Sequence, residues 1–142
     1  MNKPLYLSFF EYNYDALLEY TQSFVKTIRN SEGYNKKRLL IISGMNADIV
    51  ATCSDKYKMP KDPSNKLAIS VEYYIPSQFT SSTYNFFNYG NNWGNEEEYK
   101  KLIENFNNLK NNYVNKGIPV IIVEVGVLTE ANKEISSIRE YL

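Results

Sequence analysis

Three short runs of aliphatic residues constrain the fold of this chain more than any other feature of its sequence. They are RLLIIS at 38–43, LAISVEYY at 67–74 and IPVIIVEV at 118–125. Each run is rich in β-branched residues, long enough for a strand and too short for a typical helix. Because their apolar character is continuous rather than strictly alternating, we expect strands covered on both faces, as in a parallel sheet.

Segments with helical periodicity alternate with these runs. Apolar residues recur at three- and four-residue steps over 14–29, which predicts a first helix. A second helix should begin after Asn95, which can cap it, with Glu98 three positions later to complete a capping box. Gly117 should end that helix, and a last helix is expected from about residue 131 to the end. The apolar stripes expected to be buried are Tyr99, Leu102, Ile103, Phe106, Leu109 and Tyr113 in the second helix and Ile135, Ile138 and Leu142 in the last.

The predicted order of elements is helix, strand, strand, helix, strand, helix, which indicates a single α/β unit over 1–142. Two stretches, 44–66 and 75–94, are expected to be irregular, apart from one short helical turn in the first. The pattern fits an open doubly wound sheet and also part of a (β/α)8 barrel, and it does not separate the two.

The composition excludes several classes of function. Sixteen basic and sixteen acidic residues cancel, so the chain lacks the basic surface that nucleic-acid binding requires. Histidine is absent, which excludes histidine-based triads and histidine-ligated zinc. The one cysteine, Cys53, cannot form an internal disulfide and is interpreted as a small buried apolar residue. No apolar run approaches the ~20 residues of a membrane span, and the first ten residues show no secretory signal pattern.

Glu124 stands near the end of an otherwise aliphatic run, where a buried carboxylate would be costly. In parallel α/β folds, functional side chains collect at the carboxyl ends of the strands. Glu72 and Tyr74 end one predicted strand and Glu124 ends the next, so neighbouring strands would bring both carboxylates to one rim. Such a pair can perform acid–base or glycosyl chemistry, because one carboxyl can be held protonated while the other is ionised. The alternative is that both are ordinary solvated carboxylates at strand ends.

The segment IPVIIVEVGVLTE at 118–130 resembles the strand-seven motif of family 5 glycoside hydrolases, whose pattern is P-V-x-x-x-E-x-G. Two further segments, RLLIISGMNAD and TCSDKYKMPKDPSNKLAISVEYYIPSQF, and the WG before the acidic helix start are also similar to this family. They resemble its endo-β-1,4-glucanases, particularly those of anaerobic fungi. The resemblance extends from about Asn13 onward and includes loop residues that packing would not dictate.

The resemblance implies a retaining cellulase on a (β/α)8 barrel, of which this chain would supply roughly strands four or five to seven. It implies that Glu124 is the nucleophile, which forms a covalent glycosyl-enzyme, and that the Tyr74 hydroxyl orients it. Trp93, Tyr84 and Tyr89 would stack on sugar rings, with loop packing as the alternative. The implied partner is a β-1,4-glucan polysaccharide or oligosaccharide, the implied location is extracellular, and no metal or organic cofactor is implied.

Three departures from the family pattern affect the expected activity. If the opening Asn-Lys-Pro occupies the place of the family's Asn-Glu-Pro motif, Lys3 stands where the acid/base glutamate belongs, and lysine is a poor proton donor to a glycosidic oxygen. Glu11 is a second candidate for the missing carboxylate. The strand-six histidine of the family is replaced by Glu72, so its H-x-Y pattern reads EYY. The chain has 142 residues, whereas a complete barrel usually needs ~250.

We therefore expect an endoglucanase-like domain, truncated at both ends and inactive as an isolated chain. Unpaired strands at the edges of an incomplete barrel would favour self-association. One alternative hypothesis is a non-catalytic carbohydrate-binding or interaction module that is a remnant of a cellulase. The other is a gene fragment, or a part of a longer enzyme, with no selected function of its own.

Overall fold

The computed structural model describes residues 5–80, 91–129 and 133–142, and describes side chains from Tyr14 onward. Its longer elements are α1 (Leu5–Asn30), β1 (Leu40–Asp48), β2 (Leu67–Tyr73), α4 (Glu96–Asn112), β3 (Val120–Val125) and α5 (Ile135–Tyr141). Between them lie the short helices α2 (Ile49–Thr52) and α3 (Ser77–Thr80) and the 3-10 turns η1 (Gly33–Lys36) and η2 (Val114–Lys116). None of the helices in these ranges combines the length and the apolar character that crossing a bilayer requires.

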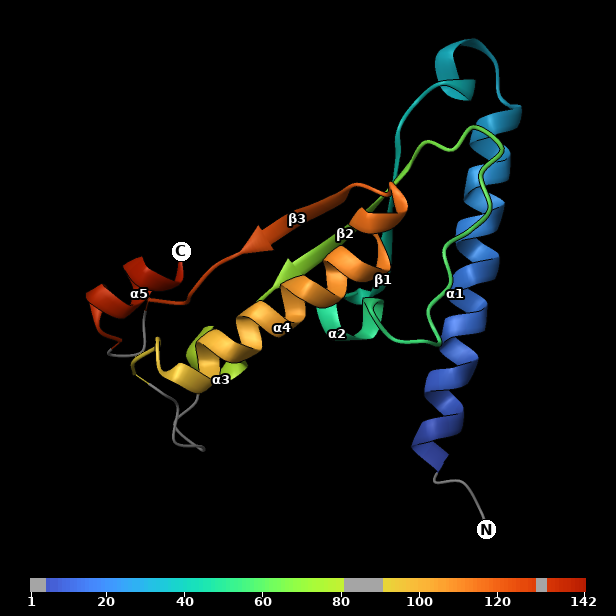
Figure 1. Ribbon diagram of the computed structural model, residues 1–142. Helices are drawn as coiled ribbons and strands as arrows, with labels where there is room; N and C mark the ends of the chain where they lie inside the picture. The colour runs from blue at the N-terminus through green and yellow to red at the C-terminus, as the bar shows by residue number, and fades with distance from the viewer. Residues whose placement is uncertain (1–4, 81–90, 130–132) are drawn as a thin grey trace.

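The three strands form one parallel sheet in the order β1-β2-β3 (Figure 1). All three strand predictions are confirmed, and the largest differences from the predicted boundaries are at the end of β1 and the start of α1. β1 continues to Asp48, into a segment predicted to be irregular, because it resumes pairing with β2 after a bulge. α1 begins at Leu5 rather than near Tyr14, since residues 5–13 contain no glycine or proline to interrupt a helix.

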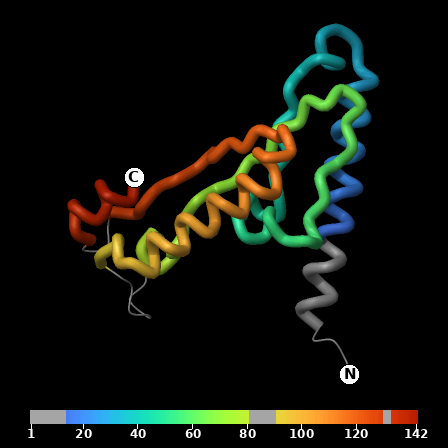
Figure 2. The backbone as a smooth tube through the Cα atoms, viewed as in Figure 1, coloured from blue at the N-terminus to red at the C-terminus, as the bar shows by residue number. Residues whose placement is uncertain are grey.

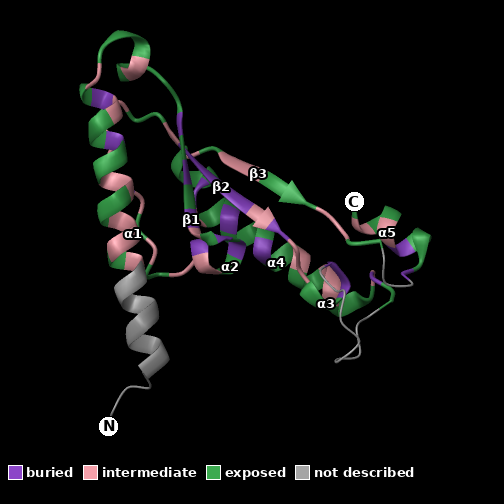
Figure 3. Ribbon diagram, turned by 180° about the vertical axis from the view of Figure 1, so that it is seen from behind, coloured by how far each residue is buried: buried purple, intermediate pink, exposed green. Residues whose placement is uncertain are grey.

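One face of the sheet carries both long helices. Val25 of α1 clusters with Ile42 of β1, and Leu109 of α4 clusters with Ile69 of β2. Ile42 and Ile69 are partners in adjacent strands, so their side chains point to the same face. On the other face Ile41 of β1 is half exposed, whereas Ala68 and Ser70 of β2 are buried. The expectation of strands covered on both faces is therefore confirmed for the central strand β2 and wrong for β1 (Figure 3). Helices on one face characterise a segment of a β/α barrel, whereas a doubly wound sheet has helices on both.

The predicted apolar stripes of the helices are only partly buried. Leu109 is buried, but Ile103 is 59 % exposed and Phe106 is 43 % exposed on the same helix. In α5 the side chains of Ile135 and Leu142, both expected to point inward, are exposed. Phe106 still contacts β2, because its ring lies edge-on to that of Tyr73 at 5.4 Å between centroids, whereas the side chain of Ile103 is mostly exposed.

The segment that leads from α2 back to β2 runs alongside α1 (Figure 2). The side chain of Gln22 in α1 donates a hydrogen bond to the carbonyl oxygen of Lys61 at 2.9 Å and accepts one from its N–H at 2.8 Å. These two hydrogen bonds hold a segment without regular secondary structure against α1.

A buried ion pair makes the second connection between α1 and this segment. The guanidinium of Arg29 donates to both carboxylate oxygens of Asp62, at 2.8 and 2.9 Å, and both side chains are almost fully buried. The same carboxylate accepts hydrogen bonds from the N–H groups of Ser64 and Lys66. These donors, Arg29 first, hold the pKa of Asp62 well below its usual range.

The predicted start of α4 is confirmed in detail. The side-chain oxygen of Asn95 accepts from the N–H groups of Glu97 and Glu98 at 3.0 Å, and the Glu98 carboxylate accepts from the N–H of Asn95 at 3.0 Å. At the other end α4 stops at Asn112, and η2 continues the chain to Gly117, whose φ of +77° suits glycine.

Replacing Asp62 with asparagine should leave the Arg29 guanidinium buried without a counter-charge. We expect the free energy of unfolding at pH 7 to fall by about 3–5 kcal/mol, measured by urea denaturation. The folded-state pKa of Asp62 lies below its unfolded value of about 3.9, so the stabilisation is complete above that pH and is lost as the pH falls through the folded pKa. The free energies of unfolding of the wild type and the variant, plotted against pH, should therefore converge at acidic pH.

The matched control is Asp55→Asn, which removes the same charge from an exposed position. It should change the free energy of unfolding by no more than about 0.5 kcal/mol. Equal stability of the Asp62 and Asp55 variants at pH 7 would contradict the role given to the buried pair.

Candidate active site

Three carboxylate residues line up across the carboxyl edge of the sheet. Asp48 at the end of β1 pairs with Glu72 of β2, and Glu72 pairs with Glu124 of β3. Such partners in adjacent strands are about 4.8 Å apart and direct their side chains to the same face. The predicted meeting of Glu72 and Glu124 at one rim is confirmed. Asp48 extends the row, although it lies in a segment predicted to be irregular.

One extra residue in β3 places Glu124 on this face. Pairing is regular up to Val71, but the next pair is Glu72 with Glu124, and Val123 has no partner in β2. Without this bulge Glu124 would pair with Tyr73, whose side chain is buried on the helix-covered face. A shift of one residue moves a side chain to the opposite face of a sheet, and bulges beside active sites re-aim side chains in this way.

Tyr74 bonds directly to the predicted nucleophile. Its hydroxyl donates a hydrogen bond to Oε2 of Glu124 at 3.0 Å, and both groups are accessible to solvent. The hydrogen bond to Glu124 raises the pKa of Tyr74 because the carboxylate stabilises the neutral phenol, and the charge of Glu72 adds a smaller effect in the same direction. The contact is the one that the orienting role predicted for Tyr74 requires.

The end of β1 is irregular where it reaches the rim. Four of its residues, 44–47, stand opposite a single residue of β2. Asn46 and Ala47 both have a φ of +54°, a conformation that residues other than glycine rarely adopt. Gly44 lies so close to Thr52 that an added Cβ would stand 1.9 Å from the threonine hydroxyl oxygen. Strained backbone of this kind concentrates at functional sites.

A pocket of about 380 Å³ opens at this rim. Its lining residues are Asn46, Asp48, Glu72, Tyr74, Ile75, Pro76, Ser77 and Gln78. Tyr74, the residue that bonds to Glu124, therefore also lines the pocket, whereas Glu124 itself does not. No group of three or more carboxylate or thiol side chains among the described residues is arranged to hold a metal ion.

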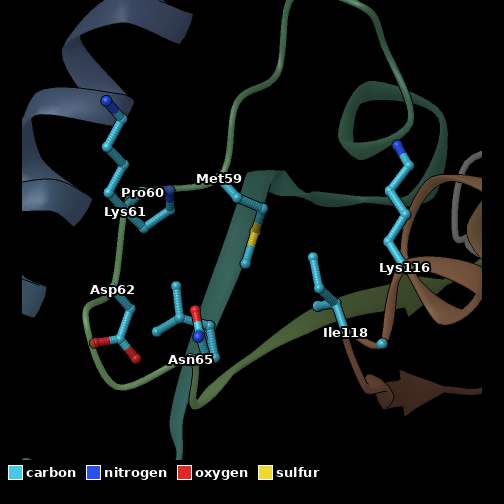
Figure 4. A pocket seen from close by; sticks show the side chains of 9 residues that line it. Met59, Pro60, Lys61, Asp62, Asn65, Lys116 and Ile118 are labelled. Atoms are coloured by element: carbon cyan, nitrogen blue, oxygen red, sulfur yellow. The ribbon is translucent and has the colours of Figure 1, made fainter.

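A second pocket, of about 440 Å³, lies at the amino ends of the strands (Figure 4). It is lined by Leu67 at the start of β2 and by Ile118 just before β3, and Lys61 and Lys116 stand on its two sides. Because the chemistry of parallel β/α folds collects at the carboxyl ends of the strands, the smaller pocket is the candidate site.

The structure corrects the prediction that Trp93 stacks on sugar rings. Trp93 is only 7 % exposed, and its ring lies edge-on to those of Tyr99, at 4.8 Å, and Tyr141, at 5.4 Å. Its ring is thus occupied by packing between α4 and α5, which was the alternative interpretation.

Other predicted residues have different outcomes. Lys3, Tyr84 and Tyr89 lie outside the described residues, and Glu11 lies in the part of α1 whose side chains are not described, so their roles stay predictions. Cys53, expected to be buried, is partly buried against the core, and this burial raises the pKa of its thiol.

The fold and the rim together define a segment of a parallel β/α barrel with candidate catalytic carboxylates at the carboxyl ends of its strands. The model of the cellulase family, glycosyl hydrolase family 5, matches residues 4–142. The chain therefore belongs to this family, as the sequence motifs predicted.

Relatives of known identity are endoglucanases and a lichenase. Endoglucanase 1 of Ruminococcus albus is 34% identical over 130 residues, which cover 90% of this chain and 30% of that protein. A GH5-4 broad specificity endoglucanase from an uncultured bovine rumen ciliate superposes with a TM-score of 0.84 and 44% identity, over 90% of this chain and 40% of that one. A mutant of the glycoside hydrolase 5 lichenase from Caldicellulosiruptor sp. F32, in complex with cellotetraose, gives a TM-score of 0.79 and 30% identity, over 90% and 35% of the two chains.

The chain thus spans only about a third of the length of these relatives, as the shares of 30% to 40% show. Its three-stranded parallel sheet and helices match part of the barrel of these structures. The prediction of a partial (β/α)8 barrel is confirmed.

The contact between Tyr74 and Glu124 predicts an ordered effect of two substitutions on the pKa of Tyr74. Glu124→Gln should lower it towards about 10, the ordinary value for tyrosine, and Glu72→Gln should lower it less, because Glu72 acts only through its charge. The titration is followed by NMR of ring-labelled tyrosine, and the Tyr74 signal is assigned by its disappearance in Tyr74→Phe. An unchanged titration of Tyr74 in Glu124→Gln would contradict the hydrogen bond in solution.

Proposed function

We propose that this chain is the nucleophile-bearing part of an endo-β-1,4-glucanase catalytic domain that acts on β-1,4-glucan with retention of configuration. The observation that carries the proposal is the position of Glu124, which a bulge turns onto the rim and Tyr74 bonds at 3.0 Å. Family membership and the endoglucanase relatives support the same reaction. On family resemblance we also propose an extracellular location, where such a polysaccharide is found.

In this reaction a carboxylate oxygen of Glu124 attacks the anomeric carbon while the glycosidic C–O bond breaks. The departing oxygen takes a proton from a general acid, and its conjugate base later removes a proton from the water that attacks the glycosyl-enzyme, which releases the sugar and the Glu124 carboxylate. Because Tyr74 bonds to Oε2, Oε1 is the oxygen available for attack. Tyr74 is therefore a positioning residue that restricts the rotation of the nucleophile.

This chain differs from its family at the residue that would act as the general acid. The acid/base carboxyl of a retaining enzyme lies roughly 5–5.5 Å from the nucleophile. If the opening Asn-Lys-Pro corresponds to the family's Asn-Glu-Pro motif, Lys3 takes its position, and Glu11 is the second candidate. Glu72, the register partner of Glu124, stands instead at the family's histidine position. We infer that the 142-residue chain cleaves unactivated β-glucan at least about 10²-fold more slowly than a complete enzyme, the typical effect of a lost general acid.

The role of Glu124 can be tested without a general acid. A 2-deoxy-2-fluorocellobioside with a dinitrophenolate leaving group needs no proton at the departing oxygen, so we expect it to form a covalent adduct on Glu124 that mass spectrometry locates. Glu124→Gln should abolish the adduct, and β-glucan should be cleaved slowly or not at all by the same wild-type sample.

Two outcomes would contradict the proposal. Labelling of a different residue, or no labelling at saturating reagent, would leave the alternative function, a non-catalytic carbohydrate-binding remnant. Rapid cleavage of β-glucan by the 142-residue chain would instead overturn the inferred loss of the general acid.

We further propose that the unpaired sheet edges mediate association with a second copy of the chain. Within the described residues β1 and β3 each pair on one side only, with β2. Ile41 on the uncovered face and Tyr20 and Phe24 of α1 are exposed apolar side chains, and exposed strand edges pair readily with other chains.

Sedimentation velocity over a range of concentrations should show reversible association of the wild-type chain. Ile41→Lys, which places a charge on the exposed face of an edge strand, should shift the chain towards monomer by about tenfold or more in dissociation constant. Val50→Lys, at an equally exposed apolar position in α2, is the control and should associate as the wild type does. Equal behaviour of the two variants would exclude the β1 edge as the interface.

A further inference from the structure

We propose that the pocket at the amino ends of the strands binds a small organic anion with an apolar body, of the aryl carboxylate type. This pocket lies at the end of the sheet opposite the rim that carries Glu124, so its ligand is not the substrate of the reaction proposed there. The inference is therefore independent of the proposed function.

The pocket lies at the junction of two apolar clusters in the core. One cluster joins β2 to α4 and includes Ile69 and Leu109, and the other joins β1 to α1 and includes Ile42 and Val25. Among the described residues, Met59 alone packs against both clusters, and Met59 also lines the pocket. Because protein interiors are normally close-packed, a hollow of about 440 Å³ at this junction provides room for a ligand. The volume lies within the roughly 300–1,000 Å³ range of small-molecule sites.

The pocket opens on the helix-covered face of the sheet. Leu67 packs against the cluster at α1 and Ile118 against the cluster at α4, and both residues line the pocket. In a β/α barrel the helices form the outer layer. The pocket therefore belongs to this outer layer and is not a gap on the inner side of an incomplete barrel.

The floor of the pocket is apolar. Met59, Leu67 and Ile118 contribute side chains that are only partly buried. Figure 4 shows the side chains of Met59 and Ile118 between those of Lys61 and Lys116. An apolar ligand body placed on this floor would remove more of its surface from water, which stabilises the bound state.

The sides of the pocket carry positive charge. Lys61 and Lys116 are exposed, and neither ammonium group forms an ion pair with a carboxylate of the described residues. Among the lining residues only Asp62 has a carboxylate, and its two oxygens already accept four hydrogen bonds, two from Arg29 and two from backbone N–H groups. Since an ionised carboxylate offers about four acceptor sites, that of Asp62 has none left for the lysines. The two cations are thus complementary to the anionic head group of a ligand whose body covers the floor.

Three probes separate the two parts of this recognition. 2-Naphthoate has an anionic head and an apolar body, 2-naphthamide keeps the body without the charge, and acetate keeps the charge without the body. Each probe is titrated at pH 7 into the 142-residue chain labelled with ¹³C in its methionine methyl groups, and the Met59 signal, assigned by its loss in Met59→Leu, is followed by NMR. We expect a saturable shift with 2-naphthoate and binding at least about tenfold weaker with each of the other two probes.

Substitution of the lysines tests the charge. Lys116→Gln should weaken binding of 2-naphthoate by about fivefold and leave that of 2-naphthamide unchanged, because only the charged head group is attracted to the ammonium. Adding Lys61→Gln to this variant should reduce the affinity for 2-naphthoate to that for 2-naphthamide. The matched control is Lys100→Gln, which removes the same charge from an exposed position of α4 outside the pocket and should leave all three affinities unchanged.

Three results would each overturn the inference. They are the lack of a saturable shift of Met59, equal affinity for 2-naphthoate and 2-naphthamide, and equal weakening by Lys100→Gln and Lys116→Gln, which would show attraction to surface lysines in general. None of them changes the labelling expected on Glu124, so this pocket and the proposed function can fail separately.

Discussion

β2 is the element on which the rest of the structure depends. Among the strands that the structure describes, it alone is paired along both edges, and its side chains Ile69, Val71 and Tyr73 are buried under the helices. Burying such a side chain contributes on the order of 1.5–3 kcal/mol each, which makes the outer face of β2 the anchor for α4. The opposite side of the same strand ends in Glu72 and Tyr74. The position of the rim is therefore set by the strand that is paired on both sides.

The two neighbours of β2 are regular at their amino ends and irregular at their carboxyl ends. Leu40 to Ser43 pair residue by residue with β2, as do Val120 to Ile122, and the shifts in register come only afterwards. Regular pairing throughout would have turned Glu124 towards the helices and kept Asp48 out of register with Glu72. The amino halves of the strands thus build the core, while the bulges near the rim collect the carboxylates.

The sequence predicts the features that depend on a local pattern of residues. It misses those that depend on which segments lie next to each other in the fold. The strands and the Asn95 cap follow from short windows of residues, and the motif around Glu124 carries a family signature. The bulge at Val123 is invisible in the sequence because alternation along a strand determines a face only when the neighbouring strand pairs without interruption. The Arg29–Asp62 pair joins residues 33 positions apart. From the sequence alone, each of the two charges is expected to be solvated, so their pairing is missed. Ile103 has the periodicity of a core residue, yet burial also requires a neighbour to cover it.

The order of the sheet has a consequence for synthesis on the ribosome. Each strand pairs with the one translated just before it, so β2 can add to β1, and β3 to β2, as the nascent chain emerges. At about 5–20 residues per second, only seconds separate the appearance of successive strands. No pairing in this sheet has to wait for a distant segment, and each newly made apolar edge is covered on one side soon after it leaves the exit tunnel.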